Sequence, residues 1–338
     1  MRSQAETDPE LLLDLPSGIP GLILDEIQYA PELFSRIKMR IDAARSKKGY
    51  WILTGSQQFQ MMKGLSETLA GRIGLVELPT LCVREAFGDT ATSKALFSAA
   101  CLRGLYPELV ADAQRNSGNW YAAYLQTYLE RDIRTLYDIG NLREFERFLQ
   151  LLAARCAQQL HLSHLASDVG VAVNTIRRWV SILEACGIIF LLQPWHANLG
   201  KRVVKTPKVY FMDCGLVCYL VRLRDAQHLL HGPMAGALFE NLCIQEAVKR
   251  FLNLGERPRI YYYRDKDGLE VDLLVEETLG DVRPFELKLT QTPNQGHAES
   301  LVRFMARQRI PEASLVTLTE HPKPLTRTVQ VLPLRSFL

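Results

Sequence analysis

The sequence has no long hydrophobic run, no strong excess of charge of either sign and no regular spacing of its cysteines. No run of about 18 apolar residues occurs, so we expect no membrane-spanning helix. The net charge of +3 does not indicate nucleic-acid binding by bulk charge, and only a local basic patch could indicate it. The odd number of cysteines, 7, and the polar N-terminus predict a protein of the reducing cytoplasm with mostly buried thiols.

The phosphate-binding motif G-x-x-x-x-G-K-[S/T] is also absent from the sequence, although part of a nucleotide site is present. Residues Leu22–Glu26 form an apolar stretch that ends in two adjacent acids, Asp25 and Glu26. This is the form of a Walker B strand, in which the first acid holds Mg²⁺ through water and the second orients an attacking water. Only 24 residues precede Asp25, too few for a phosphate-binding strand, loop and helix. We therefore expect either the loss of an N-terminal part or a chain that never bound nucleotide in the usual way.

Alternating strands and helices predict a parallel sheet in the N-terminal region. Apolar strands are expected over Leu22–Asp25, Tyr50–Thr54 and Ile73–Leu78, with an amphipathic helix over Pro31–Lys38. Because ligands bind at the carboxyl ends of parallel strands, polar residues at these ends are candidates for a nucleotide site. They are Asp25, Glu26, Thr54, Ser56 and Gln57.

Ser56, Gln57 and Arg72 are candidates for contacts with a nucleotide phosphate. Ser56 and Gln57 follow a strand beside the Walker B strand, where they could sense a γ-phosphate. A simple turn after Gly55 is the alternative. Arg72 could reach a phosphate bound by its own chain or by a neighbouring subunit of a homo-oligomer. An ordinary surface arginine is the alternative for this residue.

The region after residue 160 has the pattern of a helix–turn–helix. A helical stretch from Leu162 ends at Gly170, and a second helix is expected from a cap near Asn174 to Leu183. Two strands, Ile188–Leu192 and Lys208–Met212, flank a basic loop. A short helix, a glycine turn, a second helix and a strand pair resemble a winged DNA-binding module.

The charges of this region favour contact with DNA. Six basic residues and one acid, Glu184, lie between Asn174 and Lys208. The local excess of positive charge is a plausible phosphate-binding footprint in a nearly neutral protein. The alternative is a module that only packs between domains, with solvated charges. The candidate DNA-binding residues are Asn174, Thr175, Arg177, Arg178, Lys201 and Arg202.

Near the C-terminus, carboxylates and a lysine occur in a second informative order. Glu240 lies on a predicted helix, Asp272 on a strand after a hairpin turn, and Glu286 and Lys288 on the next strand. Residues two apart in a strand project from the same face, so Glu286 and Lys288 should point together. This order resembles the PD-(D/E)XK nuclease fold.

The residue types suit metal-dependent cleavage of a phosphodiester. Two carboxylates, Asp272 and Glu286, could hold a hard divalent cation such as Mg²⁺. The cation polarises a phosphate and activates water, while Lys288 positions that water or offsets developing charge, with Glu240 nearby. Two alternatives remain: an exposed ion pair of small energetic value, and a nuclease fold that binds DNA without cleaving it.

Several segments, taken together, resemble a large prokaryotic family with an AAA-type ATPase domain followed by a second domain. Leu22–Gln28, Leu53–Ser56 and Leu69–Arg72 look like the ATPase domain. The segments that resemble the second domain are Tyr128–Asp132, Asn198–Arg202, Tyr210–Leu216, Gly236–Asn241 and Glu270–Asp272. The resemblance implies ATP as the cofactor of full-length members, a winged helix and a nuclease-like C-terminal domain. This sequence departs from the family by lacking the phosphate-binding motif.

The expected fold class is α/β, in four regions. Residues 1–90 form a truncated P-loop-type parallel sheet domain, and residues 91–160 a helical linker region. Residues 161–215 form the winged helix–turn–helix, and residues 216–338 a PD-(D/E)XK nuclease-like domain. We expect an N-terminally truncated AAA-family protein that does not hydrolyse ATP by itself and that binds DNA. The alternative is a metal-dependent DNA nuclease or a non-cleaving DNA-binding module of that fold.

Overall fold

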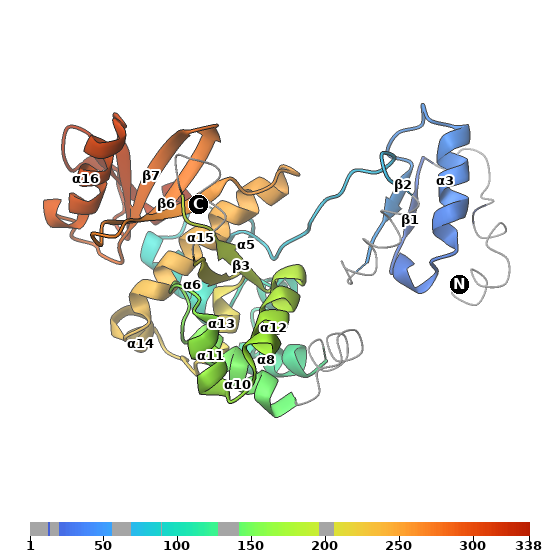
Figure 1. The fold of residues 1–338 in the computed structure, drawn as a ribbon, viewed down its shortest axis with the longest axis horizontal. Helices are drawn as coiled ribbons and strands as arrows, with labels where there is room; N and C mark the ends of the chain where they lie inside the picture. The colour runs from blue at the N-terminus through green and yellow to red at the C-terminus, as the bar shows by residue number, and fades with distance from the viewer. Residues whose placement is uncertain (1–12, 14–19, 56–68, 89, 128–141, 196–205) are drawn as a thin grey trace. The chain divides into compact units, whose positions relative to one another are not determined.

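In the computed structural model, the residues described are 13, 20–55, 69–88, 90–127, 142–195 and 206–338. They belong to two compact units (Figure 1): an N-terminal unit, Met1–Leu75, and a C-terminal unit, Val76–Leu338. Each unit is described by itself. Within the described residues, no helix has both the length and the apolar character needed to cross a membrane.

The N-terminal unit contains a pair of parallel strands and one helix. Strand β1 (Leu22–Leu24) pairs with β2 (Trp51–Leu53), and the turn η1 (Ile27–Tyr29) and helix α3 (Leu33–Ala43) connect them. Leu33, Phe34 and Ile37 lie on one face of α3, are buried and pack into a small core. This confirms the predicted strand–helix–strand order.

The third strand predicted for this region is wrong. Residues 73–78 have no strand assignment. Within the described residues, Val76 is 76% exposed and Leu78 is 94% exposed, so neither side chain is packed as in a covered sheet. An apolar sequence forms a strand only where a pairing edge and a covering layer are available.

The first part of the C-terminal unit is helical. Helix α10 (Leu142–Ala153) has a continuous apolar face that includes Phe145, Phe148 and Leu152. The segment Tyr128–Asp132 lies outside the described residues. Within the described residues of this unit, four helices precede α10: α5 (Val83–Phe87), α6 (Ser93–Leu102), α7 (Pro107–Ala111) and α8 (Ser117–Tyr124). Two more, α13 (Cys214–Leu220) and α14 (Ala226–His231), come later in the chain, before the C-terminal sheet.

Two helices and a strand pair follow α10. Helix α11 (Leu162–Val169) ends at Gly170, whose φ of 89° places it in the left-handed region that glycine tolerates. Helix α12 (Val173–Ala185) comes next, and then β3 (Ile189–Leu192) pairs antiparallel with β4 (Lys208–Phe211).

The helix predicted after Gly170 is confirmed, and it starts close to the predicted cap, but Asn174 does not cap it. Helix α12 begins one residue earlier, with Ala172 at the N-cap. The Asn174 side chain instead accepts a hydrogen bond from Arg177 Nη1, at 2.9 Å. The apolar face of the helix, which includes Ile176, is buried as the predicted period requires.

The C-terminal part is a sheet of six strands in the order β5-β6-β7-β8-β10-β9. The first three strands are antiparallel neighbours, whereas β8 runs parallel to both β7 and β10. The elements are α15 (Ala235–Asn253), β5 (Ile260–Arg264), β6 (Glu270–Thr278), β7 (Asp281–Leu287), η4 (Gln295–Ala298), α16 (Glu299–Gln308), β8 (Ala313–Thr317), β9 (Lys323–Pro324), β10 (Val329–Pro333) and α17 (Leu334–Phe337).

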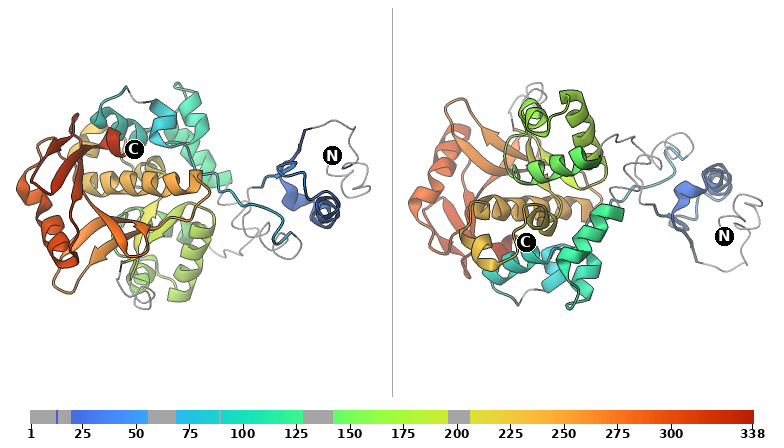
Figure 2. Two further views of the ribbon diagram at one scale, coloured as in Figure 1. Left: turned by 90° about the horizontal axis from the view of Figure 1, so that it is seen from above. Right: turned by 90° about the horizontal axis from the view of Figure 1, so that it is seen from below.

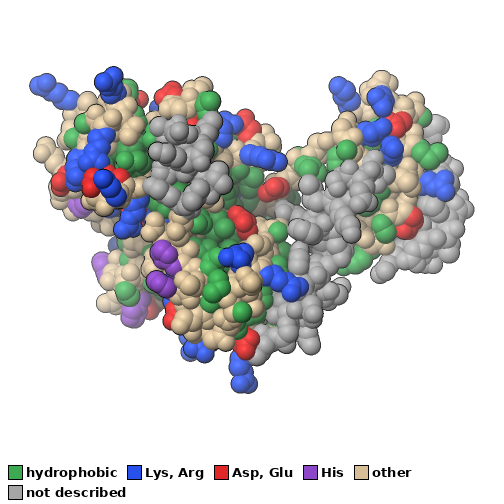
Figure 3. All heavy atoms as spheres, in the orientation of Figure 1, with side chains coloured by type: hydrophobic (Ala, Val, Ile, Leu, Met, Phe, Trp, Pro, Cys, Tyr) green, Lys and Arg blue, Asp and Glu red, His purple; other side chains and the backbone are tan. Residues whose placement is uncertain are grey.

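Helices cover both faces of this sheet (Figure 2). Along β8, Leu315 joins the apolar cluster that contains residues of α16, whereas the next residue, Val316, joins the cluster that contains residues of α15. Because successive strand residues point to opposite faces, α15 and α16 lie on opposite sides of the sheet. Figure 3 shows both acidic and basic side chains on the drawn surface of each unit.

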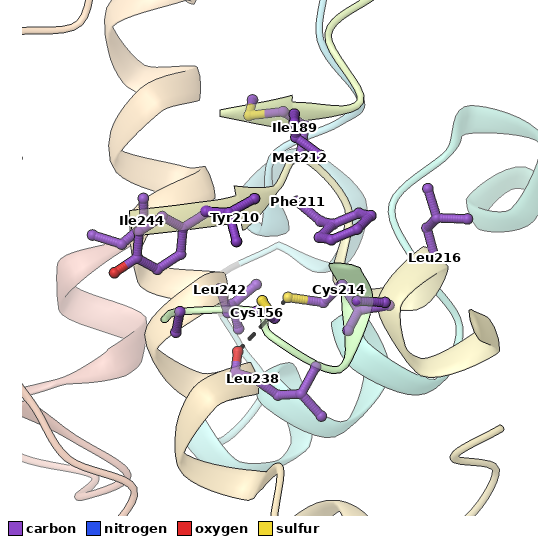
Figure 4. Packing of buried hydrophobic residues seen from close by; sticks show 14 of the residues in the cluster. Cys156, Ile189, Tyr210, Phe211, Met212, Cys214, Leu216, Leu238, Leu242 and Ile244 are labelled. Carbon is purple, nitrogen blue, oxygen red and sulfur yellow. Dashed lines mark hydrogen bonds between the residues drawn. The ribbon is translucent and has the colours of Figure 1, made fainter. Parts of the chain in front are cut away.

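The core beneath α15 contains free thiols. Cys156, Cys214 and Leu238 meet there (Figure 4), and Asn241 accepts a hydrogen bond from Cys156 Sγ and donates one to Cys214 Sγ. Of the 7 cysteines, 5 are buried and none is in a disulfide. The prediction of mostly buried thiols is therefore confirmed.

Candidate functional site

Strands β6 and β7 separate where their two acids lie. Their pairing ends at Leu273 and Phe285. Asp272, just before Leu273, and Glu286, just after Phe285, are the next residues beyond this last pair along the two strands, and both are buried. The backbone N–H of Leu287 donates to Asp272 Oδ2, at 2.9 Å. A carboxylate therefore satisfies a backbone donor at the position where the ladder opens.

A bulge in β6 helps to place Asp272. Tyr261 pairs with Leu274 and Tyr263 pairs with Val271, so Asp272 and its neighbour both lie opposite Tyr262. Bulges of this kind redirect a side chain and are common next to functional sites. Strand period alone would not predict this position.

Lys288 joins the two acids. Its Nζ lies 2.7 Å from Glu286 Oε1 and 3.6 Å from Asp272 Oδ2. Burial lowers the pKa of Lys288, but the charges of Asp272 and Glu286 more than offset this, so the pKa is raised. The ammonium group therefore stays charged at neutral pH, beside the acidic side chains of Asp272 and Glu286.

The second oxygen of Glu286 is the least satisfied atom of this cluster. Oε2 is buried and has no hydrogen-bond partner among the described residues. Burial, followed by the charge of Asp272, raises the pKa of Glu286 to about 8. A buried carboxylate oxygen without a donor is costly unless it gains a proton or a cation.

Glu240 approaches from α15 but is held by β4. Its Oε1 accepts hydrogen bonds from Lys208 Nζ, at 2.9 Å, and from the Tyr210 hydroxyl. Lys208 Nζ also lies 2.6 Å from Glu270 Oε1. Burial and the charge of Asp272 raise the pKa of Glu240 to about 7.

Sequence reasoning missed the role of Lys208. It was counted with the basic residues around the predicted wing, yet it is buried and cannot belong to a surface patch. The sequence contains a hint of this role, because Lys208 is the first residue of an otherwise apolar strand. All four residues of that strand, Lys208–Phe211, are buried. A lysine in such a strand needs an acidic partner.

The residues fit a cation held by two carboxylates rather than a closed metal cage. Within the described parts of the chain, no group of three or more His, Cys, Asp or Glu side chains is arranged to hold a metal ion. Mg²⁺ commonly takes one or two carboxylates and completes its shell with water and phosphate oxygens. Asp272 and Glu286, with the unpartnered Oε2 of Glu286, match that donor set.

The acids of the N-terminal unit have a different setting. Asp25 follows β1 and is exposed, and its Oδ1 accepts a hydrogen bond from the Thr54 hydroxyl at the end of β2. Glu26 has a left-handed backbone (φ 54°), and its carboxylate accepts a hydrogen bond from Gln28. The strand ends are thus brought together as expected, whereas Ser56 and Gln57 lie outside the described residues.

Arg72 contacts helix α3. Its Nε and Nη2 lie 2.9 and 3.1 Å from the two carboxylate oxygens of Asp42. The hydrogen bond from Arg72 lowers the pKa of Asp42 to about 2. A phosphate contact by Arg72 would have to compete with this bidentate pair.

The candidate DNA-binding residues of α12 are on the surface. Asn174, Arg177 and Arg178 are exposed, and Thr175 is half-buried. They lie in the first half of the helix. Lys201 and Arg202 lie outside the described residues.

Comparison with known families gives three consecutive matches. The chain matches an AAA domain over residues 2–87. It matches two domains of unknown function, DUF8612 over residues 94–227 and DUF4143 over residues 235–337. No solved structure matches the chain.

The relatives include two mycobacterial proteins. The chain is 32% identical to the uncharacterized proteins Rv2008c of Mycobacterium tuberculosis and Mb2031c of Mycobacterium bovis, over 98% of this chain and 72% of each relative. It is 25% identical to the uncharacterized protein MJ1637 of Methanocaldococcus jannaschii, over 32% of this chain and 23% of that protein. With an AAA domain at its N-terminus and DUF4143 at its C-terminus, the chain belongs to an AAA-type ATPase-like family that includes the two mycobacterial proteins.

Proposed function

We propose that this AAA-family protein binds DNA and cleaves it with a divalent cation held by Asp272 and Glu286. The observation that carries the proposal is the buried Glu286 Oε2, which has no partner among the described residues and lies in a carboxyl group beside Asp272 and Lys288. The elements follow the order of the PD-(D/E)XK fold: helix α15 with Glu240, the β5–β6 hairpin with Asp272, and β7 with Glu286, followed directly by Lys288.

The chemistry expected at this site follows from its charges. A bound divalent cation would polarise the scissile phosphate and lower the pKa of a water molecule. Asp272 and Glu286 would hold it, and their burial would keep competing water away. Lys288, whose raised pKa keeps it charged, would orient the attacking water or offset charge on the phosphate.

The proposed DNA contact rests on the helices and strands around α12. Their order is α10, a single bridge between Gln159 and Lys208, α11, α12 and the β3–β4 pair. This is the order of a winged helix, in which the last helix enters the major groove. The exposed Arg177 and Arg178 would contact phosphates or bases there.

A second candidate function, ATP binding, rests on the AAA domain match. Asp25 and Thr54 meet at the carboxyl ends of parallel strands, where nucleotides bind in such sheets. The chain itself contains no G-x-x-x-x-G-K-[S/T] motif. We therefore propose that this chain by itself does not hydrolyse ATP.

A cleavage assay tests the first proposal. Supercoiled, linear duplex, single-stranded and branched DNA are incubated with the full chain and Mg²⁺ or Mn²⁺. Glu286→Gln should abolish cleavage, because it removes a ligand charge but keeps the side-chain shape. Lys288→Ala should slow cleavage on the order of 10²-fold while changing DNA affinity little, because its role lies in the transition state.

Glu277→Gln is the matched control. Glu277 lies on the same strand as Asp272 but is exposed, and the same chemical change there should leave cleavage unaltered. Cleavage that persists in Glu286→Gln would have another source. If no metal-dependent cleavage occurs on any of the four DNA forms, the enzymatic proposal is wrong.

A further inference from the structure

Lys208 is a buried cation among the carboxylates of the candidate site. Its side chain is 5% exposed, and its ammonium group contacts Glu240 from α15 and Glu270 from β6. The Tyr262 ring lies on another side, with its centroid 5.5 Å from Nζ. Two carboxylate oxygens and an aromatic face form a cation-binding shell that the lysine occupies.

The surroundings hold this lysine in place. The Tyr262 hydroxyl donates to the carbonyl of Thr206, two residues before Lys208, and accepts from Gln159 Nε2. Gln159 also forms a bridge with Lys208 itself. These contacts tie the Tyr262 ring, which lies beside the ammonium group, to the backbone next to Lys208.

The cluster divides into two pairs of acids with one lysine each. Lys288 contacts Asp272 and Glu286, and it leaves one oxygen of Glu286 without a partner. Lys208 contacts Glu240 and Glu270. Only the first pair therefore has an unpartnered buried oxygen for a further cation; the shell of the second pair already holds an ammonium ion.

We propose that Lys208 acts as an internal counter-ion that occupies a second cation position, so that the candidate site binds one divalent cation rather than two. This inference rests on the proposed function for the cation at Asp272 and Glu286. A second divalent ion at Glu240 and Glu270 would have to displace the Lys208 ammonium group, which contacts both carboxylates. At Asp272 and Glu286 the buried Glu286 Oε2 has no partner among the described residues. Lys208 is a positioning residue, because it acts by holding Glu240 and Glu270.

The experiment measures how many Mn²⁺ ions bind. The full chain is titrated with Mn²⁺ by calorimetry, and free Mn²⁺ is counted by electron paramagnetic resonance, at a pH above the raised pKa values of Glu240 and Glu286. Wild type should bind one ion. Lys208→Met removes the charge and keeps an unbranched side chain of similar length, so this variant should bind two.

A matched control uses the same substitution at an exposed lysine. Lys266, in the turn between β5 and β6, is exposed, and Lys266→Met should leave the count at one. Two ions in wild type, or one ion in Lys208→Met with wild-type affinity, would overturn the inference. No ion in wild type and one in Lys208→Met would support the counter-ion role and reject the proposed cation at Asp272 and Glu286. No ion in either protein would reject both.

Another variant keeps the test decisive if Lys208→Met does not fold, as judged by circular dichroism. The double change Glu240→Gln with Glu270→Gln leaves Lys208 in place. It should still bind one Mn²⁺, with an affinity lowered by no more than about 100-fold, since neither residue is a ligand in the proposed arrangement and both lie only near the ligands. Loss of Mn²⁺ binding in this variant would show that they are ligands and would overturn the inference.

Discussion

The two units carry neighbouring carboxylates in opposite surroundings. In the N-terminal unit, Asp25 is exposed and accepts a hydrogen bond from Thr54 on the adjacent strand end. In the C-terminal unit, Asp272 and Glu286 are buried, and one oxygen of Glu286 has no partner among the described residues. Water can solvate the first acid, whereas the second pair must share protons or cations.

The difference shows that carboxylates of the same type differ in their electrostatics according to burial. Burial raises the pKa of Glu286 to about 8 because the charged form loses its hydration, and the charge of Asp272 adds to this effect. The acids of the C-terminal unit are assembled from strands and a helix distant in sequence. Those of the N-terminal unit are consecutive residues after one strand.

The largest expected effect is on stabilisation by Mn²⁺. A cation that binds only the folded protein should stabilise the C-terminal unit by about 2.7 kcal/mol at 100 times its Kd. Glu286→Gln should remove this stabilisation, and Asp25→Asn should keep it. Differential scanning calorimetry of the full chain with and without Mn²⁺ measures it. If Glu286→Gln and Asp25→Asn lost the Mn²⁺ stabilisation equally, the proposed difference between the acids of the two units would be wrong.

A smaller effect on the free energy of unfolding is expected when the pH is changed in the absence of metal. The unfolded chain releases the Glu286 proton near its ordinary pKa of 4.5, whereas the folded protein keeps it up to about 8. Between these values the folded protein binds the extra proton, so stability should fall as the pH rises through this window and then level off.

Denaturant unfolding at several pH values measures this dependence. Glu286→Gln should flatten it, because the amide does not titrate. Glu277→Gln, the exposed neighbour on β6, should leave the slope as in wild type. A stability that rises with pH across this window would mean that the Glu286 carboxylate is stabilised, not destabilised, by folding.

The expected effect on DNA affinity is smaller still. If α12 and the β3–β4 pair contact four to six phosphates, the log–log salt slope should be roughly −4 to −5. Arg177→Ala combined with Arg178→Ala should remove up to two contacts and flatten the slope by up to about 2. Fluorescence anisotropy of labelled duplex DNA at several salt concentrations measures both quantities.

A double change at exposed arginines elsewhere is the control for charge alone. Arg303 on α16 and Arg327 after β9 are exposed, and their change to Ala should leave the slope unaltered. If both double variants behave alike, DNA is attracted by general charge and α12 has no special role.

The smallest effect is expected for nucleotide. Without phosphate-cradling amides and a phosphate-binding lysine, little remains in this chain to bind a triphosphate. Calorimetry with Mg-ATP should show no saturable binding below millimolar concentration, and Asp25→Ala should change nothing. Micromolar binding that is lost in Asp25→Ala would mean that another segment supplies the cradle.

The sequence predicted many local elements correctly. Strand β1, helix α3 and the β5–β6–β7 strands follow from apolar period and turn residues, which are local signals. The failures have a common cause. Ile73 packs against the N-terminal core, but residues 73–78 have no strand assignment, and α12 starts without the side-chain cap that its sequence offers. Both outcomes depend on neighbours distant in sequence.

By itself, the sequence determined the order of elements, the acids at strand ends and the proximity of Glu286 and Lys288 on one strand. Strand geometry alone fixes that last relation. Only the tertiary structure decided that β6 and β7 separate at Asp272, that Glu240 is held by Lys208, and that one oxygen of Glu286 has no partner among the described residues. These features depend on burial and on contacts between distant segments, because the cost of an unpaired charge arises only where water is excluded.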